Sequence, residues 1–191
     1  MIDWSKYFTL YKKYINDTAE VKHHIMMELS EGALQDTLVN ESGEKVKISR
    51  LMGYIYDEPV TYKYANLSLV GTTWTAQLDA VREKINLTCG GGFNSVLINV
   101  YRDGRDEIRW HSDKEQQIGE NPVIPTLNVG ASRTFHFLHR ETGEKTSVLL
   151  EDGDLLVMST QCQPDCLHAV LKEKHVKDIR ISLTFRRVNY T

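Results

Sequence analysis

Apolar residues in the first half of the chain recur at helical spacing. Residues 1–40 are mostly polar, and the stretch DTAEVKHHIMMELSEG sets apolar side chains three to four residues apart after Asp17 or Thr18, either of which can cap a helix. A second helix is predicted after Thr72 or Thr73, ending at the three glycines 90–92. Its apolar face comprises Trp74, Leu78, Val81 and Ile85. The first 40 residues are therefore predicted to be helical, with a second helix before residue 93.

From residue 93 onward the pattern changes to short runs rich in branched and aromatic residues. The runs are FNSVLINVY, IPTLNVGA, RTFHFLH, KTSVLL, DLLVMS and RISLTFRRV, separated by turn signals such as RDG and EDGD. Helices followed by at least six short strands predict an α+β chain whose second half is a sandwich or an open barrel. Between the two halves lies an aromatic segment, YIYDEPVTYKYAN.

Length and composition narrow the class of protein. A chain of 191 residues, 41% hydrophobic and 26% charged, is expected to form one globular domain. No apolar run is long enough for a membrane span, and the N-terminus lacks the layout of a secretory signal. Three cysteines make no disulfide framework, which favours an intracellular, reducing compartment. The net charge of -3 means that nucleic-acid binding would depend on a local patch.

The stretch YRDGRDEIRWHSDKE contains a histidine and a carboxylate two residues apart. If the segment is a strand, His111 and Asp113 point to the same side and can present a nitrogen and an oxygen to one metal ion. The alternative is a solvated polar hairpin in which both residues pair with neighbouring arginines. The metal interpretation needs a second histidine, because two histidines and one carboxylate form the facial triad of non-haem iron sites.

The candidates for that second histidine are His136, His139, His168 and His175. Each of them can equally have a surface role or a hydrogen-bonded role in the core. The stretch CQPDCLH also brings two cysteines close to His168, which raises a zinc alternative, although no second Cys/His pair with suitable spacing accompanies it.

The stretch RISLTFR separates by parity into an apolar and a polar face. Arg180, Ser182, Thr184 and Arg186 fall on the polar face, which either faces water or lines a polar barrel interior. In the second case the guanidinium groups can bind a dicarboxylate through paired hydrogen bonds. In LINVY, Asn99 and Tyr101 share one strand face and can contact the same small acid, or can be ordinary polar strand residues.

Taken in order, these blocks resemble the AlkB family of iron(II)- and 2-oxoglutarate-dependent dioxygenases. The resemblance covers about residues 93–188 and is carried by FNSVLINVYRDGRDEIRWHSD, GASRTF, GDLLVM, LHAV and RISLTFR. It implies a double-stranded β-helix (jelly roll) with N-terminal helices and a nucleotide-recognition lid. Residues 1–92 would form the helices and the lid, and residues 93–191 the catalytic core.

The resemblance also implies roles for individual residues. His111, Asp113 and His168 would bind Fe(II), with Arg186 completing the catalytic set. The sites implied to hold 2-oxoglutarate are Asn99, Tyr101, Arg180, Ser182 and Arg186. Ser182 departs from the asparagine usual in the family, which puts one contact in doubt. A second departure is the short segment between RTFHFLHR and TSVLLEDGD, where some members have a longer loop.

The implied reaction uses Fe(II), 2-oxoglutarate and dioxygen to oxidise an N-methyl group of 1-methyladenine or 3-methylcytosine in DNA or RNA. Formaldehyde and succinate would be released. Tyr62 and Tyr64, in the lid segment VTYKYA, would contact a flipped or single-stranded base, with Glu115 nearby. The tyrosines can also be packing residues. The alternative function is a related dioxygenase acting on a protein or a small molecule.

The implied partner is alkylated nucleic acid, bound by a monomer with no membrane association. Several basic residues could contact phosphates despite the acidic total, or could form a solvated face. They are Arg50, Lys63, Arg102, Arg105, Lys172, Lys174, Lys177 and Arg187.

Overall fold

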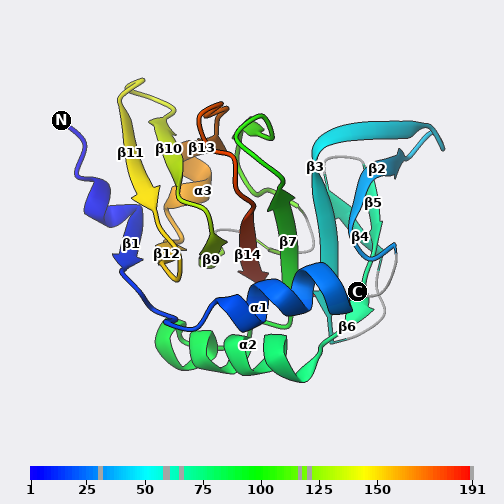
Figure 1. The fold of residues 1–191 in the computed structure, drawn as a ribbon. Helices are drawn as coiled ribbons and strands as arrows, with labels where there is room; N and C mark the ends of the chain where they lie inside the picture. Colours follow the sequence, from blue (N-terminus) through cyan, green and yellow to red (C-terminus); the bar gives the residue numbers. More distant parts are fainter. Residues whose placement is uncertain (30–31, 58–60, 65–66, 116–117, 120–121, 190–191) are drawn as a thin grey trace.

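The computed structural model describes residues 1–29, 32–57, 61–64, 67–115, 118–119 and 122–189, with backbone only for Glu28 and residues 61–64. Figure 1 shows strands packed side by side, with two helices in the lower part of the view. The helices are η1 (Trp4–Lys6), α1 (Ala19–His23), the π-helical turn η2 (His24–Glu28), α2 (Ala76–Cys89) and α3 (Cys162–Asp165). No helix in the described ranges is both long enough and apolar enough to cross a bilayer.

The strands fall into an N-terminal and a C-terminal group. The first group is β1 (Phe8–Tyr11), β2 (Gln35–Asn40), β3 (Lys45–Tyr56), β4 (Thr61–Tyr64), β5 (Leu67–Val70) and β6 (Thr72–Thr73). The second is β7 (Ser95–Tyr101), β8 (Ile108–His111), β9 (Ile124–Gly130), β10 (Arg133–His139), β11 (Lys145–Leu150), β12 (Leu155–Met158), β13 (Cys166–Val170) and β14 (Arg180–Arg186).

These strands form two sheets. The larger follows the order β1-β12-β9-β14-β7-β3-β2-β5-β4, with β6 beside β3, and the smaller follows β11-β10-β13-β8. All pairings in the described residues are antiparallel except β3 with β6. Strands of both sheets line one cavity, which therefore lies between the sheets as in a jelly roll. The predicted fold class is confirmed.

Strand β14 shows why the two faces of the larger sheet differ. Its apolar residues pack in one core cluster with Val21 of α1 and Leu78 of α2. On the opposite face of the strand, the cavity is lined by Arg180, Ser182, Thr184 and Arg186. All seven residues of β14 are buried, so its polar face is inside the barrel and not in water.

The first 40 residues were predicted to be helical, which is wrong for two stretches. Phe8–Tyr11 pairs with β12, and Gln35–Asn40 pairs with β3 and β5. Both are short, and strand pairing with distant parts of the chain overrides local propensity there. The helix between them begins after Thr18, one of the two predicted caps.

The second predicted helix is present but starts later than expected. Thr72 and Thr73 form β6 along β3, and the N-cap is Thr75. The C-terminal boundary agrees with the prediction, because Gly90 adopts a φ of 88°, a left-handed conformation that glycine reaches without strain.

Strand β3 links the two halves of the chain. It pairs with β7 from Leu51↔Val100 to Tyr56↔Ser95, so the larger sheet continues across residue 92. The N-terminal residues thus contribute β1 and β3 directly to the sheet that carries the cavity.

Candidate active site

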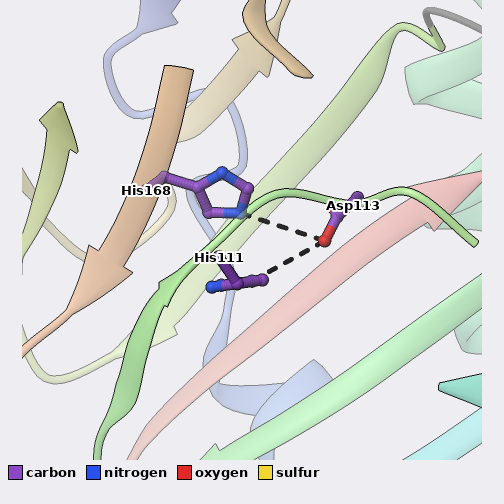
Figure 2. A group of neighbouring side chains, drawn as sticks. All are labelled: His111, Asp113 and His168. Carbon is purple, nitrogen blue, oxygen red and sulfur yellow. Dashed lines mark ion pairs between the residues drawn. The ribbon is translucent and has the colours of Figure 1, made fainter. Parts of the chain in front are cut away.

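Two histidines and an aspartate lie close together in the lining of the cavity. His111 is the last residue of β8, Asp113 lies in the irregular segment that follows, and His168 is the central residue of β13. His111 and His168 are direct partners across the β8/β13 ladder, with their ring centroids 4.2 Å apart. Figure 2 shows both rings facing the Asp113 carboxylate. Its Oδ1 lies 3.6 Å from His111 Nε2 and 3.9 Å from His168 Nε2.

Strand alternation does not explain why Asp113 lies close to His111. Strand parity was expected to align His111 with Asp113, but β8 ends at His111. Asp113 is instead held by tertiary contacts. Its backbone N–H donates to Gln163 Oε1 at 2.8 Å, and its Oδ2 pairs with the Arg186 guanidinium at 3.1 Å.

The imidazoles are oriented by their own neighbours. His111 Nδ1 lies 2.8 Å from the carbonyl oxygen of Arg109 and, because a carbonyl only accepts, must donate to it. The Nε2 lone pair is then left to face Asp113, as a metal ligand requires. His168 is nearly parallel to Phe135, with ring centroids 5.4 Å apart.

The protonation states of the three side chains at neutral pH favour binding of a cation. Burial and the nearby His111 lower the pKa of His168 to about 3, and burial lowers that of His111. Burial opposes ionisation of Asp113, but the positive charge of Arg186 outweighs it and lowers the pKa of that carboxyl. At neutral pH the group therefore offers two neutral imidazoles and one carboxylate.

This donor set fits Fe(II). One ligand atom from each of the three residues lies within 4.8 Å of the others, and two histidines with one carboxylate leave coordination positions open. It is the only group of three or more metal-binding side chains found among the described residues. Cys162 and Cys166 are buried free thiols outside that group, so the zinc alternative gains no support there.

The three other histidine candidates lie elsewhere. His136 contacts Trp110, with a ring separation of 6.3 Å, and His139 interacts with the Tyr7 hydroxyl at 3.2 Å. His175 is exposed and lies 3.9 Å from Glu173.

The other side of the cavity is formed by paired residues of β7 and β14. Tyr101 lies opposite Arg180 in the ladder, and Asn99 lies opposite Ser182. All four, together with Arg186, line the cavity that contains the metal-binding triad. The five residues predicted to hold the co-substrate are thus brought together.

Arg180 is a buried cation that forms no ion pair within the described ranges of the chain. Its side chain is 1% exposed, and neither terminal nitrogen has a hydrogen-bond partner among the residues that the structure describes. Burial lowers the pKa of the guanidinium. The Tyr101 ring lies against it, 4.9 Å from the guanidinium carbon. An anion with two oxygens would complete this environment.

Three residues near the site were not predicted. Arg50 had been placed among surface cations, yet it is 5% exposed and its Nε donates to Asn99 Oδ1 at 2.6 Å. Gln163 holds Asp113, and Asn128 holds Arg180. Asn128 had a signal in the sequence, because Thr126 and Asn128 alternate with apolar residues in IPTLNVGA. No pattern in the sequence indicated the contacts of Arg50 and Gln163.

The predicted base-binding residues are placed only in part. Tyr62 and Tyr64 belong to β4, paired with Leu69 and Leu67 of β5, but their side chains lie outside the described part of the structure. Glu115 is half-buried, two residues beyond Asp113.

Residues 8–186 match the 2OG-Fe(II) oxygenase superfamily. The chain is 36% identical to alpha-ketoglutarate-dependent dioxygenase alkB homolog 3 of Rattus norvegicus over 148 residues, 73% of this chain and 50% of the relative. It is 34% identical to DNA oxidative demethylase ALKBH2 of Bos taurus over 140 residues, 69% of this chain and 50% of the relative. The chain thus spans about half the length of these curated relatives.

The solved structure of OsALKBH1 shares the fold. It superimposes with a TM-score of 0.63 at 16% identity, covering 94% of this chain and 97% of that one. A cavity with a His-Asp-His triad, a matching superfamily and relatives named for alkB lead to one conclusion: the chain belongs to the 2OG-Fe(II) oxygenase superfamily, within which it is an AlkB-type protein.

Proposed function

We propose that this protein is an Fe(II)- and 2-oxoglutarate-dependent dioxygenase that oxidatively demethylates N-alkylated bases of DNA or RNA. The observation that carries the proposal is one cavity lined by a His-Asp-His triad and by the buried Arg180, whose two terminal nitrogens lack a hydrogen-bond partner among the described residues. The superfamily uses Fe(II), 2-oxoglutarate and dioxygen. When bound, these groups would supply the oxidation of the N-methyl group to a hydroxymethyl group, which would be released as formaldehyde.

The protein's own residues would bind and orient the reactants. His111, Asp113 and His168 would hold the metal, and Arg186 keeps Asp113 ionised. Arg180 would bind the distal carboxylate of 2-oxoglutarate. Four other residues in the same cavity would help to bind 2-oxoglutarate: Asn99, Tyr101, Ser182 and Arg186.

The relatives support a nucleic-acid substrate. ALKBH2 is by name a DNA oxidative demethylase. A base inside a duplex cannot reach a cavity between two sheets, so we expect a flipped or single-stranded base. 1-Methyladenine and 3-methylcytosine are positively charged, which favours an aromatic face and a carboxylate. Tyr62 and Tyr64 in β4 and Glu115 after Asp113 are proposed for these roles.

We also propose roles for the two halves of the chain, its oligomeric state and its location. Residues 93–191 would supply the catalytic residues of the core. Residues 1–92 would carry the base-recognition lid in addition to β1 and β3, which extend the larger sheet. The protein would act as a monomer. The three free cysteines support an intracellular, reducing location.

The test incubates the protein with Fe(II), ascorbate, 2-oxoglutarate and oligonucleotides that carry one 1-methyladenine or 3-methylcytosine. Single-stranded DNA, duplex DNA and RNA are compared, and mass spectrometry follows the methyl group while succinate is measured in parallel. We expect loss of the methyl group with matching succinate, abolished by His111→Ala. Succinate without demethylation of any oligonucleotide would favour a protein or small-molecule substrate. If neither succinate nor demethylated oligonucleotide is formed, the proposed dioxygenase activity is refuted.

A further inference from the structure

We propose that Asn128 is a positioning residue that orients Arg180 for the distal carboxylate of 2-oxoglutarate, and so sets the affinity for the co-substrate. The inference rests on the proposed function and concerns a residue without an assigned role in it. Its basis is the hydrogen bond from Arg180 Nε to Asn128 Oδ1, 2.5 Å long and fully buried.

Asn128 reaches Arg180 from the neighbouring strand. In the β9/β14 ladder it lies directly opposite Ser182, which itself lies opposite Asn99 of β7. The short side chain of Ser182 brings no amide to Arg180 from its own strand. The amide comes instead from β9, and Asn128 is 0% exposed.

The orientation of the Asn128 amide is determined by its other contacts. Nδ2 donates to the carbonyl oxygen of Glu151 at 3.0 Å and reaches that of Ala131 at 3.5 Å. Because carbonyl oxygens only accept, the amide nitrogen must face them, and Oδ1 must face Arg180. Backbone bonds to Asp154 and Gly153, both 2.9 Å, attach Asn128 to the turn before β12.

A neutral amide at this position has a specific electrostatic consequence. It satisfies Nε without neutralising the guanidinium, whereas a carboxylate would do both. The two terminal nitrogens have no hydrogen-bond partner in the described part of the chain, and Arg180 lines the cavity. Asn128 therefore holds the cation in place and leaves its charge for an incoming carboxylate.

The experiment measures two affinities of the 191-residue protein by isothermal titration calorimetry. Mn(II), a redox-stable substitute for Fe(II), is titrated first, and 2-oxoglutarate is then titrated into the Mn(II)-loaded protein. We expect Asn128→Ala to raise the Kd for 2-oxoglutarate by about 10-fold or more, as for the loss of a hydrogen bond to a charged group. The Kd for Mn(II) should stay within about twofold of the wild type, because Asn128 has no contact with the triad.

A second variant and a control separate orientation from folding. Asn128→Asp keeps the size of the side chain but neutralises Arg180, so we expect a comparable loss of 2-oxoglutarate affinity. Asp154→Asn disturbs the same turn, where Asp154 accepts the backbone N–H of Glu151 at 2.8 Å, without touching Arg180. It should lower the melting temperature and leave the Kd for 2-oxoglutarate unchanged.

The outcomes distinguish this inference from the proposed function. Failure of the wild-type protein to bind 2-oxoglutarate would overturn both. Normal binding by the wild type and by both Asn128 variants would overturn only the role of Asn128. Parallel losses of Mn(II) and 2-oxoglutarate affinity in both variants would indicate a general structural role and would also overturn it.

Discussion

At the scale of single residues, the ion pair between Arg186 and Asp113 shapes the chemistry of the site. Both side chains are almost completely removed from water, 2% and 3% exposed, and lie 3.1 Å apart. The buried charge of Asp113 is tolerated because Arg186 compensates it. Asp113 can therefore remain an anionic ligand between two histidines that burial keeps neutral.

Arg186→Met should destabilise the metal-free protein strongly, because it leaves a buried carboxylate without its counter-charge. We expect the free energy of unfolding, measured by urea denaturation, to fall by about 3–5 kcal/mol. Arg187→Met is the matched control, since Arg187 is exposed and should change stability by less than about 0.5 kcal/mol.

The cause can be separated from lost packing by a double variant. Asp113→Asn combined with Arg186→Met removes both charges and should recover part of the loss. If the double variant is no more stable than Arg186→Met alone, the uncompensated charge does not explain the destabilisation.

At the scale of elements, the short helix α3 connects two metal-binding segments. It directly precedes β13, which carries His168, and its buried Gln163 accepts the backbone N–H of Asp113. Gln163 Nε2 also reaches the sulfur of Met158 in β12 at 3.5 Å. Asp113 follows the end of β8 and has no ladder of its own, so α3 fixes the distance between this ligand and His168.

Gln163→Leu should therefore weaken metal binding while the fold remains. We expect the Kd for Mn(II) to rise about 10-fold or more, as for the loss of other groups that orient metal ligands. Gln161→Leu changes an exposed glutamine at the N-cap of the same helix and serves as the control. Equal Mn(II) affinities for the two variants would show that Gln163 does not orient Asp113.

At the scale of the whole molecule, the buried histidines couple stability to pH. The folded-state pKa of His168 is about 3, whereas an unfolded histidine titrates near 6.5. Between these values the unfolded chain binds more protons than the folded one. The free energy of unfolding must therefore decrease as the pH falls below about 6.5, and the loss continues toward pH 3.

This dependence can be measured on the metal-free protein in chelating buffer between pH 7.5 and 4.5. We expect the free energy of unfolding to fall by up to about 1.4 kcal/mol per pH unit for each buried histidine. His168→Gln should reduce the slope. A wild-type slope that the substitution leaves unchanged would mean that other groups cause the acid sensitivity.

Local sequence patterns predicted a large part of this architecture. The C-terminal strands, the glycine end of α2 and the parity of β14 follow from side-chain periodicity and conformational preference. The patterns failed at β1 and β2, because their strand state depends on pairing with β12 and β3. They also placed Arg50 on the surface, since nothing in its local sequence indicates the buried contact with Asn99.

The sequence by itself determined the chemical groups available to the site and, through the family resemblance, their assignment. His111 and Asp113 are close in the chain, and alternation alone places Arg180 and Arg186 on one strand face. Tertiary structure gave the physical reason that His168 joins them, because the register of β13 against β8 brings it beside His111. It also decided how the site is supported. Gln163, Asn128 and Arg186 act across separate elements, and no local pattern encodes contacts that form only when the two sheets close.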